Sequence, residues 1–332
     1  MMRCTRCVLS ERFPRIVFDR DGICNYCHQQ STEPELDRVL LRNRIDEYFQ
    51  SIRGKYHYDA IVCYSGGKDS TYTLNLAVKR YGLKVLAFTF DNGFLSSNAT
   101  SNIDRVVEEL GVDLIRFKAN KKVFNEMIKL SAVADVYPKR SLTRVSSVCQ
   151  TCINLINLKA LEFAVRFKVP AIIAGFTLGQ IPKSSVMYEF KYVTIQEYRE
   201  MQNLRFVKAL GPHVADYLQL DNDISTLPEY PQYINLLAVE PVGEIEILDE
   251  CRKLGWQKPE DTDGCSSNCR LNSVGNAVAV SRLGFHPYES ELSCLVRNGM
   301  MSREEAISKL ENFGSKEELA RNAGILGVLL DE

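Results

Sequence analysis

Residues 59–70 read DAIVCYSGGKDS, which joins an apolar run to a glycine pair and then to a helical pattern. The run at 60–64 is typical of a short buried strand. Gly66 and Gly67 allow a sharp turn, after which a helix is predicted to begin near Asp69. Such a turn gathers backbone N–H groups at the positive end of a helix dipole. The sequence therefore predicts a phosphate-binding first βα turn of an α/β sheet.

The S-G-G-K-D-S motif lacks the residues that define two common types of phosphate-binding loop. A Walker-type loop requires glycine at the position of Val62 and Ser or Thr after Lys68, and no dinucleotide-binding G-x-G-x-x-G is present. The remaining S-G-G-K-D-S resembles the pyrophosphate loop of the PP-loop ATP pyrophosphatases. The resemblance implies cleavage of ATP to AMP and pyrophosphate, with AMP transferred to a substrate oxygen. It also implies that Lys68 and Asp69 are catalytic, that Asp69 or Ser70 helps to hold Mg²⁺, and that ATP binds the residues Ser65, Gly66, Gly67, Lys68, Asp69 and Ser70.

The residues that follow alternate strand and helix patterns and predict a doubly wound, mainly parallel, Rossmann-like sheet. The further expected strands are 84–90, 112–117 and 170–175, and the expected helices are 71–81, 98–110, 121–130 and 148–167. Ends of parallel strands face the ligand crevice, and in PP-loop proteins the second strand end borders the adenosine, so the resemblance implies nucleotide contacts from Phe90 and Asp91. The glycine-bearing turn after the fourth strand predicts further contacts from Gly175 and Thr177. The expected units are a zinc ribbon (1–32), a helical connector (33–55), the ATP-binding α/β domain (56–180) and a mostly helical substrate and metal-site region (181–332).

Two close cysteine pairs open the sequence, separated by sixteen residues. This spacing is typical of a four-thiolate zinc ribbon, and a unit of this size depends on its metal for stability. Four thiolates leave no open coordination position, so we expect the zinc to be structural. Its predicted ligands are Cys4, Cys7, Cys24 and Cys27.

A second set of paired cysteines lies later in the sequence, at Cys149, Cys152, Cys265 and Cys269. These residues could hold a second structural zinc, bind a 4Fe–4S cluster, act as redox or persulfide-carrying thiols, or be unrelated small core residues. Cys149 and Cys152 open a predicted helix, where the dipole favours thiolate, so we count both as candidate catalytic residues.

Two enzyme families resemble this combination. Iron–sulfur-dependent tRNA thiolation enzymes share an N-terminal ribbon, S-G-G-K-D-S and a C-x-x-C near the middle of the sequence, but carry G-H-x-x-D-D where residues 175–180 read GFTLGQ. N-acetyl sugar amidotransferases of surface-polysaccharide pathways resemble residues 1–70 through C-T-R-C and F-D-R-D-G-I-C, and take ammonia from a separate glutaminase. The expected reaction is sulfur transfer to a small sugar or nucleotide-like acceptor, tRNA being the less expected one. The alternatives are amidine formation with a glutaminase partner, and a non-catalytic sensor of ATP and metal.

Composition agrees with a globular protein that binds nucleotide without a strong preference for nucleic acid. Of 332 residues, 45% are hydrophobic and 25% charged, and the net charge is −1 with a pI near 6.5. No signal peptide or membrane span is expected, and eleven cysteines beside a nucleotide loop favour a reducing, cytoplasmic compartment. The aromatic-rich residues 181–237 are expected to bind substrate or to form a homodimer, with most rings in the core.

Overall fold

The computed structural model describes residues 2–29, 38–177, 179–191, 193, 195–197, 200, 203–218, 229–240 and 242–330. At its centre is a six-stranded sheet with the strand order β3-β2-β1-β4-β6-β5. All neighbouring pairs are parallel except β5 with β6, which is antiparallel. The strands are β1 (Ala60–Cys63), β2 (Val85–Asp91), β3 (Asp113–Lys118), β4 (Ala171–Ala174), β5 (Met187–Glu189) and β6 (Gln232–Asn235).

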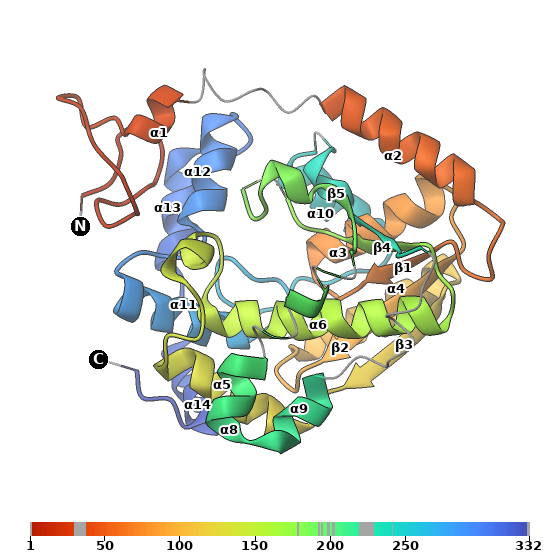
Figure 1. The fold of residues 1–332 in the computed structure, drawn as a ribbon. Coiled ribbons are helices and arrows are strands. Elements are labelled where there is room, and N and C mark those ends of the chain that lie inside the picture. The colour runs from red at the N-terminus through yellow and green to blue at the C-terminus, as the bar shows by residue number, and fades with distance from the viewer. Residues whose placement is uncertain are drawn as a thin grey trace.

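Helices connect the strands and form most of the C-terminal third (Figure 1). In the first half these are α1 (Asn25–His28), α2 (Arg38–Ile52), α3 (Lys68–Asn75), α4 (Ser97–Leu110), α5 (Lys121–Val133) and α6 (Ser147–Arg166). The later helices are α8 (Lys208–Leu210), α9 (Pro212–Leu218), α10 (Glu244–Lys253), α11 (Leu271–Leu283), α12 (Glu289–Arg297), α13 (Arg303–Glu311) and α14 (Lys316–Leu326).

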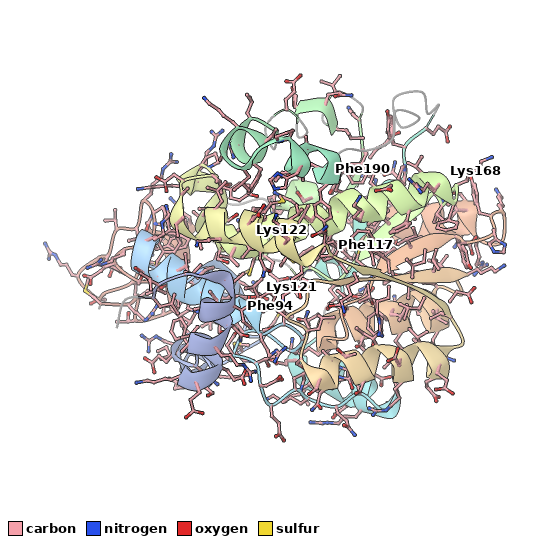
Figure 2. The ribbon with its side chains drawn as sticks, turned by 90° about the horizontal axis from the view of Figure 1, so that it is seen from below. Phe94, Phe117, Lys121, Lys122, Lys168 and Phe190 are labelled. Atoms are coloured by element: carbon pink, nitrogen blue, oxygen red, sulfur yellow. The ribbon has the colours of Figure 1, made fainter. Side chains whose placement is uncertain are left out.

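The two faces of the sheet are covered by different helices, which confirms the doubly wound arrangement. Ile61 and Phe88 pack on one side with α5, α6 and α11. Val62 and Ala87, one residue further or earlier along the same strands, pack on the other side with α2, α3, α4 and α10. The alternation follows from the two-residue period of strands. In Figure 2, Phe94 and Phe117 lie on the first of these sides, close to α5 in yellow.

The expected elements of residues 56–180 are confirmed, but the sheet is larger than expected. Each predicted strand and helix between residues 60 and 175 is present, with ends shifted by a few residues. β6 then pairs with β4 and β5 pairs with β6, so the sheet extends past residue 180, the expected end of the α/β domain. Of the expected connector, residues 33–37 lie outside the described residues, and the rest is α2.

The N-terminal cysteine unit, residues 2–29, packs against α12 and α13 from the far end of the sequence (Figure 1). Phe13 contacts Phe285 edge to face, with ring centroids 5.4 Å apart. Val8 shares a buried cluster with Leu292 and Leu310. The unit is therefore built into the C-terminal part of the fold.

One described helix, α6, is long and apolar enough to cross a membrane by length and composition. In this structure it packs against α5, α11 and the sheet. Its buried side chains belong to the main hydrophobic core, which accounts for its apolar composition.

Candidate functional site

The Ser65–Ser70 loop follows β1 and makes the sharp turn that its glycines predict. Gly66 has φ +77°, and a Cβ at this position would lie 2.3 Å from the carbonyl oxygen of Ala99. Only glycine satisfies both conditions. The Gly66 carbonyl accepts a hydrogen bond from Trp256 Nε1 at 2.8 Å, which ties the loop to the residue that follows α10. Within the loop, the hydroxyls of Ser65 and Ser70 lie 3.1 Å apart.

Charged side chains surround the start of α3. Lys68 Nζ contacts Asp69 Oδ1 at 2.8 Å and Glu244 Oε1 at 3.8 Å. Burial alone would lower the pKa of Lys68, but the charges of Asp69 and Glu244 outweigh it and raise the pKa. The lysine is therefore a fixed cation beside the loop, as binding of a pyrophosphate requires. Glu244 was not expected from the sequence, because no motif marks it.

A C-terminal segment, residues 267–270, lies between the phosphate loop and the end of β2. Ser267 Oγ accepts a hydrogen bond from Lys68 N at 3.0 Å. The Asn268 carbonyl accepts one from Ser96 N, and the Phe94 carbonyl accepts one from Arg270 N, both at 2.9 Å. The segment therefore places Cys269 between these two ends of the site, beside the carboxyl end of β2.

The strand-end residues expected to contact nucleotide differ in what they face. The ring of Phe90 is buried in the core and stacks on Phe117, with centroids 5.6 Å apart, so the ring itself does not face the loop. Asp91 Oδ1 accepts a hydrogen bond from Gly93 N at 2.9 Å, as in a turn. Gly175 lies against α3, where a Cβ would be 2.7 Å from Thr73 Oγ1.

Thr177 lines the same cavity as Lys68 and Asp69, and the volume of this cavity is about 70 Å³. The Thr177 hydroxyl donates to Glu291 Oε1 at 3.0 Å. The polar lining of the cavity includes Lys68, Asp69, Thr177, Glu244 and Glu291, together with Arg38 from α2, Glu240 and Asn298. Sequence reasoning did not identify Glu291, which lies in an ordinary amphipathic helix without a recognisable motif.

The four N-terminal cysteines converge as the spacing predicts. Their sulfur atoms all lie within 4.8 Å of one another, and all four residues are buried. Cys4 and Cys27 Sγ are 3.8 Å apart, and Cys7 and Cys24 Sγ are 3.7 Å apart. Tetrahedral zinc with Zn–S bonds of about 2.3 Å separates its sulfurs by about 3.8 Å. The cluster therefore has the geometry of a single-ion site.

Hydrogen bonds within this cluster shift the pKa values of its thiols in opposite directions. Cys4 Sγ accepts bonds from the backbone N–H groups of Cys7 and Cys24 at 3.4 and 3.3 Å. The hydrogen bond between Cys7 and Cys24 lowers the pKa of Cys7 to about 4 and raises the pKa of Cys24, and burial raises the pKa of Cys27 to about 12. His28 is engaged elsewhere, with Asp19 Oδ2 at 2.7 Å, so the ligand set consists of cysteines.

The second set of cysteines is arranged differently. Asn92 Nδ2 donates to Cys152 Sγ at 3.6 Å and to Cys269 Sγ at 3.5 Å, so these sulfurs are no more than about 7 Å apart. Cys149, one helical turn before Cys152, donates to Asn272 Oδ1 at 3.4 Å. Cys265 Sγ instead faces the Lys309 carbonyl at 3.6 Å.

The protonation state at this second set is governed by burial. Burial raises the pKa of Cys149 to about 12, so it outweighs the helix dipole that was expected to favour thiolate. Burial also raises the pKa of Cys269, and the hydrogen bond from Asn92 opposes that shift. Asn92 is oriented for this role because its Oδ1 accepts from Phe94 N at 2.8 Å.

The spacing of the second set separates the metal alternatives. Among the described residues, Cys149, Cys152, Cys265 and Cys269 form no group as tight as the N-terminal one. A single zinc ion would require that tightness. An iron–sulfur cluster puts several atoms between its cysteine sulfurs and needs wider spacing. The sulfurs of Cys152 and Cys269, bridged by one amide, fit such a group better than a zinc ion.

Comparison with known proteins adds distant likenesses. No family model matches the sequence. An uncharacterized protein of Methanocaldococcus jannaschii is 24% identical over 315 residues, which cover 93% of each of the two proteins.

Three solved structures are similar to this protein at a low level. The U34-tRNA thiolase NcsA from Methanococcus maripaludis, solved with its 4Fe–4S cluster, has a TM-score of 0.38 and 15% identity, covering 100% of this protein and 90% of its own length. NMN synthetase from Francisella tularensis has a TM-score of 0.38 and 9% identity, with 89% and 98% covered. A predicted subunit of tRNA methyltransferase from Methanocaldococcus jannaschii has a TM-score of 0.33 and 16% identity, with 70% and 91% covered. Likenesses at this level do not assign a function, which has to be argued from the residues.

Proposed function

We propose that the protein is a PP-loop ATP pyrophosphatase that adenylates an oxygen of a small sugar or nucleotide-like acceptor and replaces that oxygen with sulfur. ATP would bind with its pyrophosphate on the backbone N–H groups of residues 65–70, after Lys68 N is released from Ser267 Oγ and Ser65 N from Ser70 Oγ. Lys68 would balance the negative charge that develops as pyrophosphate leaves, and its pairing with Asp69 holds it in place before the reaction. Asp69 and Ser70 are the residues that would hold Mg²⁺, which neutralises phosphate charge when bound.

The observation that supports sulfur transfer is the course of residues 267–270. Ser267 contacts the phosphate loop at Lys68, and two residues later Cys269 contacts Asn92 together with Cys152. A thiol pair is thus connected directly to the residues proposed to bind ATP. Sulfur transfer needs a sulfur source close to the adenylate, and this arrangement supplies one.

Cys149, Cys152 and Cys269 are the residues that would hold an iron–sulfur cluster, since Cys265 faces Lys309 instead. When bound, such a cluster would hold the sulfur atom that is transferred. Asn92 would donate hydrogen bonds to two of the sulfurs, whereas the bond that the Cys149 thiol donates to Asn272 Oδ1 would be lost when Cys149 binds iron as a thiolate. The N-terminal unit would hold a structural zinc ion, as the 3.7 and 3.8 Å sulfur spacings favour.

An N-acetyl sugar amidotransferase is the second candidate, and the cavity beside Lys68 is the observation in its favour. At about 70 Å³, the cavity is large enough to admit a water-sized molecule. Ammonia is of that size. In this reaction a partner glutaminase would supply the ammonia, and the second cysteine set would be structural.

The decisive experiment combines metal content with product formation. Anaerobically purified protein is analysed for iron, sulfide and zinc and then incubated with ATP, Mg²⁺ and a panel of acceptors. Uridine and cytidine nucleotides are tested with sodium sulfide, and acetamido sugar nucleotides with ammonium chloride. A brown protein with about four irons and one zinc that forms AMP and a thiolated product supports the proposal. A colourless protein that forms AMP with acetamido sugars and ammonium supports the amidotransferase.

Lys68→Ala supplies the internal control on the ATP site. ATP–pyrophosphate exchange should fall by about 100-fold or more, the effect of removing one preorganised charge donor. Lys79→Ala removes an exposed lysine from the same helical segment and should leave exchange unchanged. Exchange that survives in Lys68→Ala would refute the assignment of the loop. Absence of AMP with every acceptor would favour a nucleotide sensor.

A further inference from the structure

Glu291 differs from the other carboxylates around the cavity in having no ion pair. Asp69 pairs with Lys68 at 2.8 Å, and Glu244 pairs with Lys309 at 2.9 Å. For Glu291, no cation lies within ion-pair distance among the residues that the structure describes. Its Oε1 accepts the Thr177 hydroxyl at 3.0 Å, while Oε2 is buried without a hydrogen-bond partner. Thr177 thus holds one carboxylate oxygen in position, and the side chain of Gln180 lies close enough to the carboxylate to lower its pKa.

The backbone around Glu291 is fixed on both sides. The loop after β4 packs directly on α12, because a Cβ at Gly179 would lie 2.8 Å from Glu291 Cα. That loop is itself held by Arg144, whose Nη1 donates to the Gly179 carbonyl at 2.7 Å. On another side of α12, the buried Glu289 binds Arg3 of the N-terminal cysteine unit at 3.0 Å. The carboxylate is therefore presented to the cavity by a preorganised helix.

We propose that Glu291 is the proton acceptor of the second half-reaction, a role that rests on the proposed function. When sulfur is supplied as free hydrogen sulfide, as in the test below, it attacks the acceptor carbon that carries AMP, and a C–S bond forms. The C–O bond to AMP breaks, and the AMP phosphate keeps its electron pair. The proton lost by sulfur passes to Glu291 Oε2. In this role Glu291 is a catalytic residue that lies on α12, outside the 65–70 loop.

The electrostatic surroundings suit a proton acceptor near neutral pH. Burial, followed by the negative charge of Asp69, raises the pKa of Glu291 to about 7, and Lys68, the hydroxyl of Thr177 and the side chain of Gln180 act against that rise. Across the cavity, Glu244 from α10 adds a negative charge that Lys309 and Lys68 balance. A base is most effective when its pKa lies close to the working pH.

The test separates the two half-reactions by their substrates. ATP–pyrophosphate exchange with the acceptor reports adenylation, and sulfide-dependent AMP release with sodium sulfide reports the second step. Glu291→Gln should keep exchange within about two-fold and lose about 100-fold or more of the sulfide-dependent rate. Glu291→Asp keeps a carboxylate and should retain an intermediate rate. Glu246→Gln, an exposed carboxylate on α10, is the matched control and should change neither rate.

A second readout needs no acceptor. Infrared difference spectra across the pKa of about 7 should show a protonated-carboxyl band in the wild type that Glu291→Gln lacks. An unchanged sulfide-dependent rate in Glu291→Gln would overturn the proposal. Parallel loss of exchange and transfer in a folded Glu291→Gln would also overturn it, because the carboxylate would then act in adenylation. Failure of exchange in the wild type itself would refute the proposed function, and is recognised before any variant is compared.

Discussion

Glutamine at position 289 would test how firmly the N-terminal cysteine unit is joined to α12. Glu289 is fully buried, and its Oε1 accepts from Arg3 Nη1 at 3.0 Å and from His286 N at 3.2 Å. Its Oε2 accepts from Ser10 N at 2.8 Å. All three partners are donors. In Glu289→Gln the side-chain NH₂ group must therefore point at another N–H donor, whichever way the amide is turned.

The expected loss follows from these contacts. Breaking a buried ion pair on one side costs about 3–5 kcal/mol, and a hydrogen bond to a charged group contributes about 1.5–3 kcal/mol. Glutamine keeps some of these bonds, and the Arg3 side chain is 20% exposed and can regain water. We therefore expect Glu289→Gln to lower the free energy of unfolding by about 2–4 kcal/mol.

Urea unfolding of the metal-loaded protein measures this loss, and transfer of metal to a chelator measures release of the cysteine unit. Glu311→Gln, an exposed carboxylate at the end of α13, is the control and should stay within about 0.5 kcal/mol. Metal should leave Glu289→Gln faster than it leaves the control, because the Arg3–Glu289 contact joins the unit to α12. A loss below about 0.5 kcal/mol with unchanged metal release would refute the reasoning.

Three further outcomes test other parts of the site. Glu291→Gln should raise the free energy of unfolding by up to about 3 kcal/mol above pH 7 and have little effect below pH 4.5, the ordinary pKa of glutamate. The reason is that the wild-type carboxyl group is buried at a cost once it loses its proton. Urea titrations at acidic and alkaline pH measure the difference. Gly66→Ala should cost about 2–4 kcal/mol in thermal unfolding through its φ and its contact with Ala99, whereas Gly54→Ala, with a similar φ in open space, should cost about 1 kcal/mol. Asn92→Asp should weaken iron retention at the second cysteine set by about ten-fold in a chelator competition, because it removes both N–H donors from the sulfurs.

Features encoded locally were predictable from the sequence. The turn at Gly66 follows from a strand, two glycines and a helix start within twelve residues, and the structure contains it. The N-terminal cysteine cluster follows from spacing alone, and its sulfurs converge as expected. The N-caps Ser302 and Ser315 accept bonds from Glu305 and Glu318 N, because capping needs only residues three apart.

Features that depend on distant contacts were not predictable. Lys68 and Ser267 are 199 positions apart, and Thr177 and Glu291 are 114 apart, so no local pattern records either hydrogen bond. Proximity in sequence groups Cys265 with Cys269, yet the sulfur of Cys265 faces α13. Phe90 was expected to contact the nucleotide because it lies near the end of a strand. The two-residue period, which puts Phe90 on the same face as Phe88, would have predicted its core position.

The geometry of α12 relates the N-terminal cysteine unit to the proposed chemistry. Residues two apart on an α-helix point in directions about 200° apart. Glu289 therefore faces Arg3 and Ser10 of the cysteine unit, while Glu291 faces Thr177 and the cavity beside Lys68. A rotation of α12 that loosened one contact would displace the other. The metal-binding unit thus constrains a carboxylate of the site without lying in the site, which gives a structural ion a defined effect on the proposed reaction.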